Sequence, residues 1–173
     1  LMSILGVIPG MDLKVGEMLS AQQKNTVSAM TEQTDIMMAR SISLSEEITK
    51  ELSQYLTANG KAFSDLNDNP QLIMDLEAAL YSSLRSALDV KYCSGVFVIL
   101  NATVNTETEY ADTSRMGIYL RLSDLKAVNT SKQHVVFFRG NADIARAEQV
   151  QLHNRWNLEF DTSALSGYEQ IMQ

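Results

Sequence analysis

Hydrophobic residues recur every three or four positions through the first third of the chain, which is the spacing of one face of an α-helix. Residues 12–56 contain no proline and a single glycine. They are rich in Glu, Gln, Lys, Ala, Met and Leu, which favour helices. We therefore predict one long helix over residues 12–56. Its most regular stripe has the heptad-like spacing of a helix-to-helix seam and consists of Val27, Met30, Thr34, Met37, Ser41, Leu44 and Ile48.

This seam leaves two interpretations open. Either the long helix packs only on the rest of its own domain, or it also pairs with its copy in a homodimer. The residues predicted to make the dimer contact are Val27, Met30, Met37, Leu44 and Ile48. Thr and Ser occupy positions where a strong zipper has Leu or Ile, so the seam is weak, which is compatible with a helix that shifts.

A second helix is predicted over residues 70–88. Asn59 and Gly60 indicate where the first helix ends, because both residue types tolerate the left-handed conformation of a C-terminal cap. Asn69 followed by Pro70 is typical of an N-cap and a first helical residue. The short connection predicts that the two helices lie antiparallel. The apolar stripe of the second helix consists of Ile73, Leu76, Leu80, Leu84 and Leu88.

The pattern then changes from helical to extended. Residues 95–104 are rich in β-branched and aromatic side chains and are apolar on both faces, which predicts a central strand covered on each side. Residues 116–122 alternate between apolar and other residues, which predicts a strand with Tyr119 and Arg121 facing away from the core. Residues 134–139 are predicted to form a third strand.

The last part of the chain is predicted to be mixed. Asn141 is expected to cap a helix over residues 142–154, within a sheet region that spans residues 95–160. Residues 157–160 are interpreted as a short strand or an extended contact. Residues 163–173 are interpreted as an exit segment with a final short helix.

The predicted fold class is therefore α+β, with residues 1–173 as a single domain. A long N-terminal helix and an antiparallel second helix pack on a small antiparallel sheet. Hydrophobic residues make up 45% and charged residues 20% of the chain, which is the composition of a globular domain with a real core. The 14 Lys and Arg residues are outnumbered by 21 Asp and Glu residues, so we expect this segment to bind no nucleic acid.

Recognisable catalytic and metal motifs are lacking, so we expect no enzyme, no cofactor and no metal. The lone Cys93 cannot form an intrachain disulfide and is interpreted as a small buried residue. An acidic stretch with Glu107, Glu109 and Asp112 lacks the central glycine and closing glutamate of a calcium loop, which favours an exposed loop.

The candidate ligand-binding residues are arginines and neighbouring aromatics. A guanidinium beside an aromatic ring holds a carboxylate by paired hydrogen bonds and stacking, so a small anionic ligand is one possibility. In the alternative interpretation each arginine pairs with a surface carboxylate and the tryptophan fills the core. The candidates are Tyr119, Arg121, Arg139, Arg155 and Trp156.

In the order of its elements the chain resembles an extracytoplasmic sensor domain of the Cache type, a PAS-like family of bacterial membrane receptors. The resemblance rests on a long entry helix, a second helix, and strands with a loop through residues 96–122. Residues 138–146 and 152–160 are similar to segments in sensor regions of Firmicutes-type receptors with AraC-type or histidine-kinase outputs. Two features depart from the family: no tyrosine follows Arg155 and Trp156, and few strands are predicted after Leu122 for a sheet that usually has five. Either residues 157–160 pair into the sheet or the sheet is reduced.

The resemblance implies an extracellular ligand-sensing domain of a transmembrane signalling protein, either a transcriptional regulator or a two-component histidine kinase. No stretch approaches the ~20 apolar residues of a membrane span. We therefore interpret the chain as a piece of a longer protein whose flanking spans hold it at the outer face of a bacterial membrane. Ligand occupancy would then reach a cytoplasmic output through helix movement. The alternative function is a structural or dimerising module without a small-molecule ligand.

Overall fold

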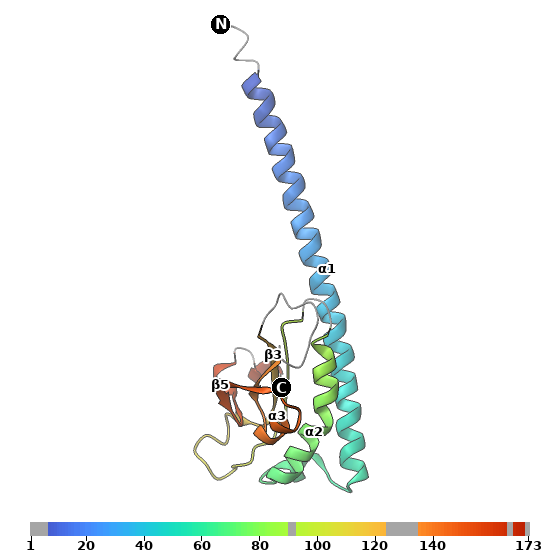
Figure 1. The fold of residues 1–173 in the computed structure, drawn as a ribbon, viewed down its shortest axis with the longest axis vertical. Helices are drawn as coiled ribbons and strands as arrows, with labels where there is room; N and C mark the ends of the chain where they lie inside the picture. The colour runs from blue at the N-terminus through green and yellow to red at the C-terminus, as the bar shows by residue number, and fades with distance from the viewer. Residues whose placement is uncertain (1–6, 90–92, 124–134, 166–167, 172–173) are drawn as a thin grey trace. The chain divides into compact units, whose positions relative to one another are not determined.

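A computed structural model describes residues 7–89, 93–123, 135–165 and 168–171 (Figure 1). The chain divides into two compact units, Leu1–Ser41 and Ile42–Gln173. Helix α1 (Val7–Ala58) contributes its first part to one unit and its last part to the other. The fold class is α+β, as predicted: a long N-terminal helix, a second helix and a small, mostly antiparallel sheet.

The first unit consists of α1 up to Ser41, and α1 starts earlier than the predicted residue 12. Pro9 is compatible with this start because the first turn of a helix needs no N–H donor at that position. Thr34 and Ser41, two polar members of the seam, donate their hydroxyl hydrogens to the carbonyls four residues earlier, at 2.9 and 2.8 Å. Such bonds weaken a helix slightly. Among the side chains described from residue 16 onward, the exposed large apolar ones of this unit are Met18, Leu19, Val27, Met30, Ile36 and Met38.

In the second unit, the last part of α1 runs antiparallel to α2 (Pro70–Ala87), as predicted. The Ser83 hydroxyl of α2 shares its one hydrogen between Oε1 of Glu51, at 2.7 Å, and Oε1 of Glu47, at 3.2 Å. Both glutamates belong to α1, so this serine joins the two helices. Ile48 and Leu56 of α1 are also buried.

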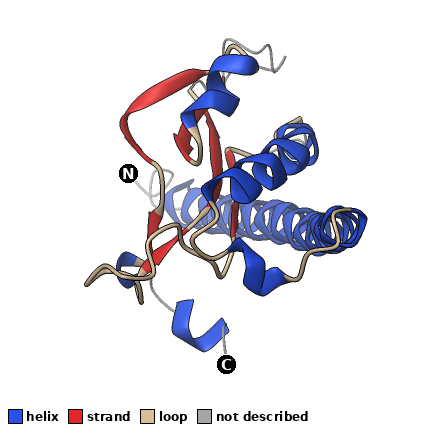
Figure 2. Cartoon of the chain, turned by 90° about the horizontal axis from the view of Figure 1, so that it is seen from below, coloured by secondary structure: helices blue, strands red, loops and turns tan. Residues whose placement is uncertain are grey.

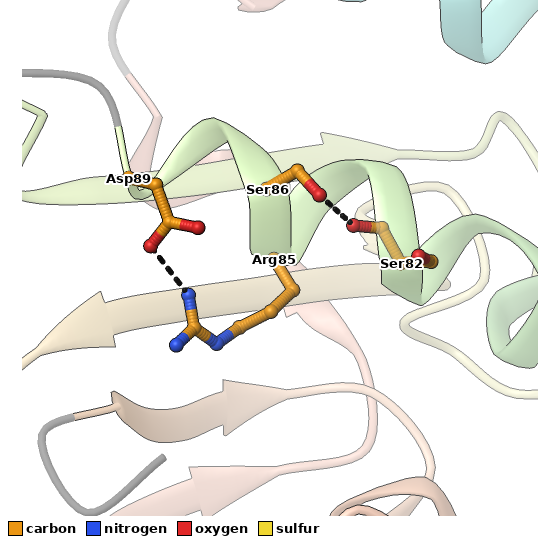
Figure 3. A network of polar contacts seen from close by, with 4 residues as sticks. All are labelled: Ser82, Arg85, Ser86 and Asp89. Atoms are coloured by element: carbon orange, nitrogen blue, oxygen red, sulfur yellow. Dashed lines mark hydrogen bonds and ion pairs between the residues drawn. The ribbon is translucent and has the colours of Figure 1, made fainter. Parts of the chain in front are cut away.

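Local signals place both ends of α2. The Asn69 side chain accepts a hydrogen bond from the Leu72 backbone N–H at 3.1 Å, which is the predicted N-cap. Near the other end, Arg85 pairs with Asp89 at 3.1 Å and the Ser86 hydroxyl donates to the Ser82 carbonyl (Figure 3). A positive side chain in the last turn also complements the helix dipole. A 3₁₀ helix, η1 (Phe63–Leu66), lies in the connection from α1.

The main sheet has the strand order β1-β3-β4-β5, with β1 (Gly95–Ile99), β3 (Gly117–Leu122), β4 (Val135–Arg139) and β5 (Gln151–Asn157). Helix α2 and the last part of α1 lie on one side of these strands (Figure 2). The inner face of the sheet, which α2 covers, includes Ile118, Leu120, Val135 and Phe137. Opposite them, α2 buries the predicted stripe of Ile73, Leu76, Leu80, Leu84 and Leu88.

Short elements complete the second unit. A separate two-stranded sheet pairs β2 (Ser114–Arg115) with β6 (Phe160–Asp161). In the described part of the predicted exit segment, the chain forms a 3₁₀ turn, η3 (Thr162–Ala164), and one short helix, α4 (Tyr168–Ile171). Residues 166–167 and 172–173 of the predicted exit segment lie outside the described residues, as does His134 of the predicted third strand.

The prediction of a helix over residues 142–154 is wrong. Helix α3 (Ala142–Ala147) is only six residues long, and the chain then forms strand β5. The helix stops because Gln149 adopts the left-handed conformation, with φ of 55°, while the Val150 N–H bonds back to the Ala145 carbonyl at 2.8 Å. Glycine normally occupies such a position, so no residue type in the sequence indicated that the helix ends here.

Two further strand predictions are corrected by the topology. Residues 95–104 were expected to form a central strand, but β1 ends at Ile99 and lies at the edge of the described sheet, with Phe97 61% exposed. The sheet is also not purely antiparallel, since β4 and β5 run parallel. A parallel pair requires a crossover connection, and α3 provides it.

Candidate functional site

The face of the sheet turned away from α2, here called the outer face, can be followed strand by strand from the pairing register. Phe97 pairs with Tyr119, Val136 pairs with both Arg121 and Gln151, and side chains alternate between faces along each strand. The outer face therefore includes Gly95, Phe97, Tyr119, Arg121, Val136, Phe138, Gln151 and His153.

Four rings form a continuous row across the outer face, one from each strand of the main sheet. Phe97 meets Tyr119 edge-on, with ring centroids 6.2 Å apart. Tyr119 lies 5.1 Å from Phe138, and Phe138 stacks on His153 at 3.9 Å. The separations of the first two pairs lie within the ~4.5–7 Å range of favourable aromatic pairs, and that of Phe138 and His153 is shorter. Phe160 of β6 lies 6.4 Å from Phe97 and extends the row at its end.

Irregularities in the strands bring Phe138 and His153 together. The β3–β4 register shifts between Tyr119 and Leu120, and the β4–β5 register shifts around Phe138. A bulge of this kind redirects a side chain. Here it places the Phe138 ring between those of Tyr119 and His153.

The ring nitrogens of His153 have distinct roles. Nδ1 accepts a hydrogen bond from the Arg155 backbone N–H at 3.1 Å. An accepting Nδ1 leaves the proton of a neutral imidazole on Nε2. His153 is half-buried, and it therefore carries an N–H donor at the end of the aromatic row.

Arg121 is the positive group of the outer face. Its side chain is exposed and makes no ion pair with any residue that the structure describes. Gly95 lies opposite it on β1, where a Cβ would stand 3.7 Å from Cγ of Arg121 and 3.3 Å from Cε2 of Tyr119. A side chain at position 95 would therefore press on the tyrosine ring and touch the arginine stem.

The other three predicted site residues lie around the end of β5. Arg139 donates from Nη1 to the carbonyls of Phe138 and Arg155, at 2.7 and 2.8 Å, so it holds backbone in place. Trp156 donates from Nε1 to the Gly140 carbonyl at 3.0 Å. Arg155 is exposed. The structure thus brings Tyr119 and Arg121 together on the outer face and gives Arg139 and Trp156 hydrogen bonds within the fold.

Sequence reasoning missed Phe97, Phe138 and His153. The alternation within residues 116–122 identified Tyr119 and Arg121, because it reveals which residues share a face of one strand. The remaining members of the row depend on the register between strands and on the bulge at Phe138. No local pattern of residues contains that information.

A buried carboxyl group lies on the other side of the sheet. Glu77 of α2 is completely buried, and its Oε2 accepts a hydrogen bond from the Asn141 backbone N–H at 3.0 Å. Oε1 has no hydrogen-bond partner in the described part of the chain. Burial raises the pKa of Glu77 to about 8, although the N–H groups of Asn141 and Gly117 oppose that rise. The side chain is therefore mostly neutral at pH 7.

A second glutamate joins three loops near the end of the sheet. Glu159 accepts hydrogen bonds from the Thr103 hydroxyl at 2.8 Å, from the Val104 N–H at 3.0 Å and from the Ser114 hydroxyl. Because these donors come from separate parts of the chain, Glu159 has a structural role. Across the described residues, no group of three or more His, Cys, Asp or Glu side chains is placed to hold a metal ion.

Comparison of the chain with protein-family models, with curated proteins and with solved structures finds no match. Among the helices that the structure describes, none is both long and apolar enough to cross a membrane. The functional interpretation therefore depends on the geometry of the chain itself and above all on the outer face.

Proposed function

We propose that the chain is the extracellular ligand-sensing domain of a transmembrane signalling protein, with its ligand bound on the outer face. The observation that carries this proposal is the asymmetry of the sheet. Helix α2 buries the inner face, whereas the outer face presents a row of four rings beside an exposed arginine. Aromatic side chains that are at least partly exposed beside an arginine are typical of a binding surface.

Contacts on the inner side of the sheet support the proposal that ligand binding on the outer face changes the position of the long helix. Leu120 of the sheet and Leu76 of α2 are both fully buried on the covered side. Ser83 of α2 then joins Glu47 and Glu51 of α1. A ligand shifts the packing of α2 and α1 only if it binds the domain more tightly in one arrangement of these helices than in another. The output would be either AraC-type transcription regulation or a histidine kinase of a two-component system.

The proposal is tested by thermal unfolding with a library of amino acids, organic acids and sugars. A ligand at 100 times its Kd stabilises the folded state by about 2.7 kcal/mol. For a chain of this size, each kcal/mol raises Tm by roughly 2–4 °C. Arg121→Ala is expected to abolish the shift given by an anionic ligand, and Arg155→Ala tests the second exposed arginine. Arg146→Ala is the matched control, because Arg146 is exposed on α3 and pairs there with Asp143.

The exposed apolar residues of the first unit favour a second candidate, a module that dimerises through α1. Val27 and Met30 are 60% and 63% exposed, and they belong to the predicted seam. Ile48 is already buried in its own chain, so the seam available to a second copy ends before it. Sedimentation of the chain and of Met30→Glu tests this candidate. A dimer that Met30→Glu dissociates, together with no Tm shift from any library compound, would favour the dimerising module over the sensor.

A further inference from the structure

We propose that the ligand of the outer face is an aromatic acid, meaning one aromatic ring joined by a short arm to an anionic group. This inference rests on the proposed function and specifies the chemistry of the same face. It draws on three independent properties of that face: its rings, its charge and the spacing of its donors.

The rings offer a surface for stacking rather than a closed core. Phe97 is 61% exposed, although burying a phenylalanine side chain stabilises a protein by roughly 1.5–3 kcal/mol. Tyr119, Phe138 and His153 are each half-buried, so part of every ring in the row is open to contact. A planar aromatic ligand can contact Phe97 and Tyr119 at the separations that these rings already keep among themselves.

The charge of the sheet selects an anion. Strands β1, β3, β4 and β5 contain no Asp or Glu and three arginines, although the whole chain carries a formal charge of −7. Arg139 is engaged with backbone carbonyls, whereas Arg121 has no ion-pair partner among the described residues. A carboxylate can form two parallel hydrogen bonds with such a guanidinium. The Tyr119 hydroxyl and His153 Nε2–H supply further donors on the same face.

The spacing of the groups sets the size of the ligand. Tyr119 and Arg121 are two residues apart on β3, which places them about 7 Å apart along one face of the strand. A ring resting against Tyr119 and Phe97 therefore brings an acid group on a one- or two-atom arm to the Arg121 guanidinium. Gly95, which pairs with Arg121, adds no side chain that would stand between these two groups.

The experiment compares three probes by calorimetry and thermal unfolding of the full chain. Phenylacetate has both the ring and the acid, acetate has only the acid, and benzyl alcohol has only the ring. We expect phenylacetate to bind at least ten times more tightly than either partial probe. Arg121→Gln should weaken phenylacetate binding by about 10- to 100-fold, since hydrogen bonds to charged groups are the stronger ones. Phe97→Ala should weaken it by about 3- to 10-fold through loss of one aromatic contact.

One further variant, one control variant and two contrary outcomes make the test specific. Gly95→Val should push the Tyr119 ring aside, because a Cβ there would lie 3.3 Å from Cε2, and should so reduce phenylacetate binding. Arg146→Ala on α3 should leave phenylacetate binding unchanged. If acetate or another aliphatic acid binds as tightly as phenylacetate and Phe97→Ala has no effect, the aromatic class is wrong while the sensing function stands. If phenylacetate and a broad compound library all fail to shift Tm, both the ligand class and the sensing function are refuted.

Discussion

Replacing Glu77 with glutamine should remove most of the pH dependence of stability between pH 5 and pH 8. In the folded chain this carboxyl group is buried on α2, and one of its oxygens has no hydrogen-bond partner among the described residues. Ionising it there places a charge where water cannot solvate it. In the unfolded chain the same group is solvated and titrates near 4.5. Folding and proton binding are therefore linked at this side chain.

The size of the effect follows from the two pKa values. Because burial raises the pKa of Glu77 from 4.5 to about 8, its favourable contribution is fully present below pH 4.5 and is lost as the pH rises through 8. At about 1.4 kcal/mol per pH unit, that interval corresponds to a loss on the order of 5 kcal/mol. Domains of this kind are stable by about 5–15 kcal/mol in total, so the loss should be easy to measure.

The assay is urea unfolding of the wild type and Glu77→Gln at half-unit steps from pH 5 to pH 8. The two proteins should agree within about 1 kcal/mol at pH 5, and the variant should be the more stable by roughly 3–4 kcal/mol at pH 8. Glu107→Gln, in an exposed loop, is the control and should keep the wild-type slope. Asp68 does not interfere, because hydrogen bonds from Thr106 lower its pKa, away from this interval. A wild-type free energy of unfolding that stays constant from pH 5 to pH 8 would refute the reasoning.

Three other variants test the packing and capping of the second unit, each by urea unfolding at pH 6. Gly117→Ala should lower the free energy of unfolding by more than about 3 kcal/mol, because φ is 151° and a Cβ would lie 2.1 Å from the Val98 carbonyl oxygen. Its control, Gly60→Ala, lies in open space and should cost only about 1 kcal/mol. Equal losses in the two variants would contradict this account. Asn69→Ala should cost about 1 kcal/mol through loss of the α2 N-cap, and an unchanged midpoint would show that the cap contributes nothing. Leu76→Ala should cost about 2–5 kcal/mol, because the side chain is fully buried; a loss below 1 kcal/mol would mean that the core refills the cavity.

The sequence was most informative where the physical signal is local. Helix α2 could be predicted because Asn69 caps the backbone three residues ahead and its apolar residues recur on one side. The same reasoning identified β3 and the common face of Tyr119 and Arg121. Each of these features depends on residues within a few positions of one another.

The features that escaped prediction depend on distant contacts or on an unusual residue choice. Phe97 is as apolar as a buried residue, so the pattern could not show that β1 is an edge strand. Gln149 adopts a conformation in which glycine is usual, and strand β5 was consequently taken for helix. The backbone hydrogen bond to the Glu77 carboxyl group comes from Asn141, which is 64 positions away in the chain.

The position of β1 leaves the fold vulnerable to self-aggregation. Sheet edges are commonly protected by lysine, proline or a bulge, which prevent another chain from adding a strand. Gly95–Ile99 has none of these and carries no charge. During synthesis or refolding at high concentration, the strand that offers Phe97 to a ligand is thus also open to pairing with a neighbouring molecule.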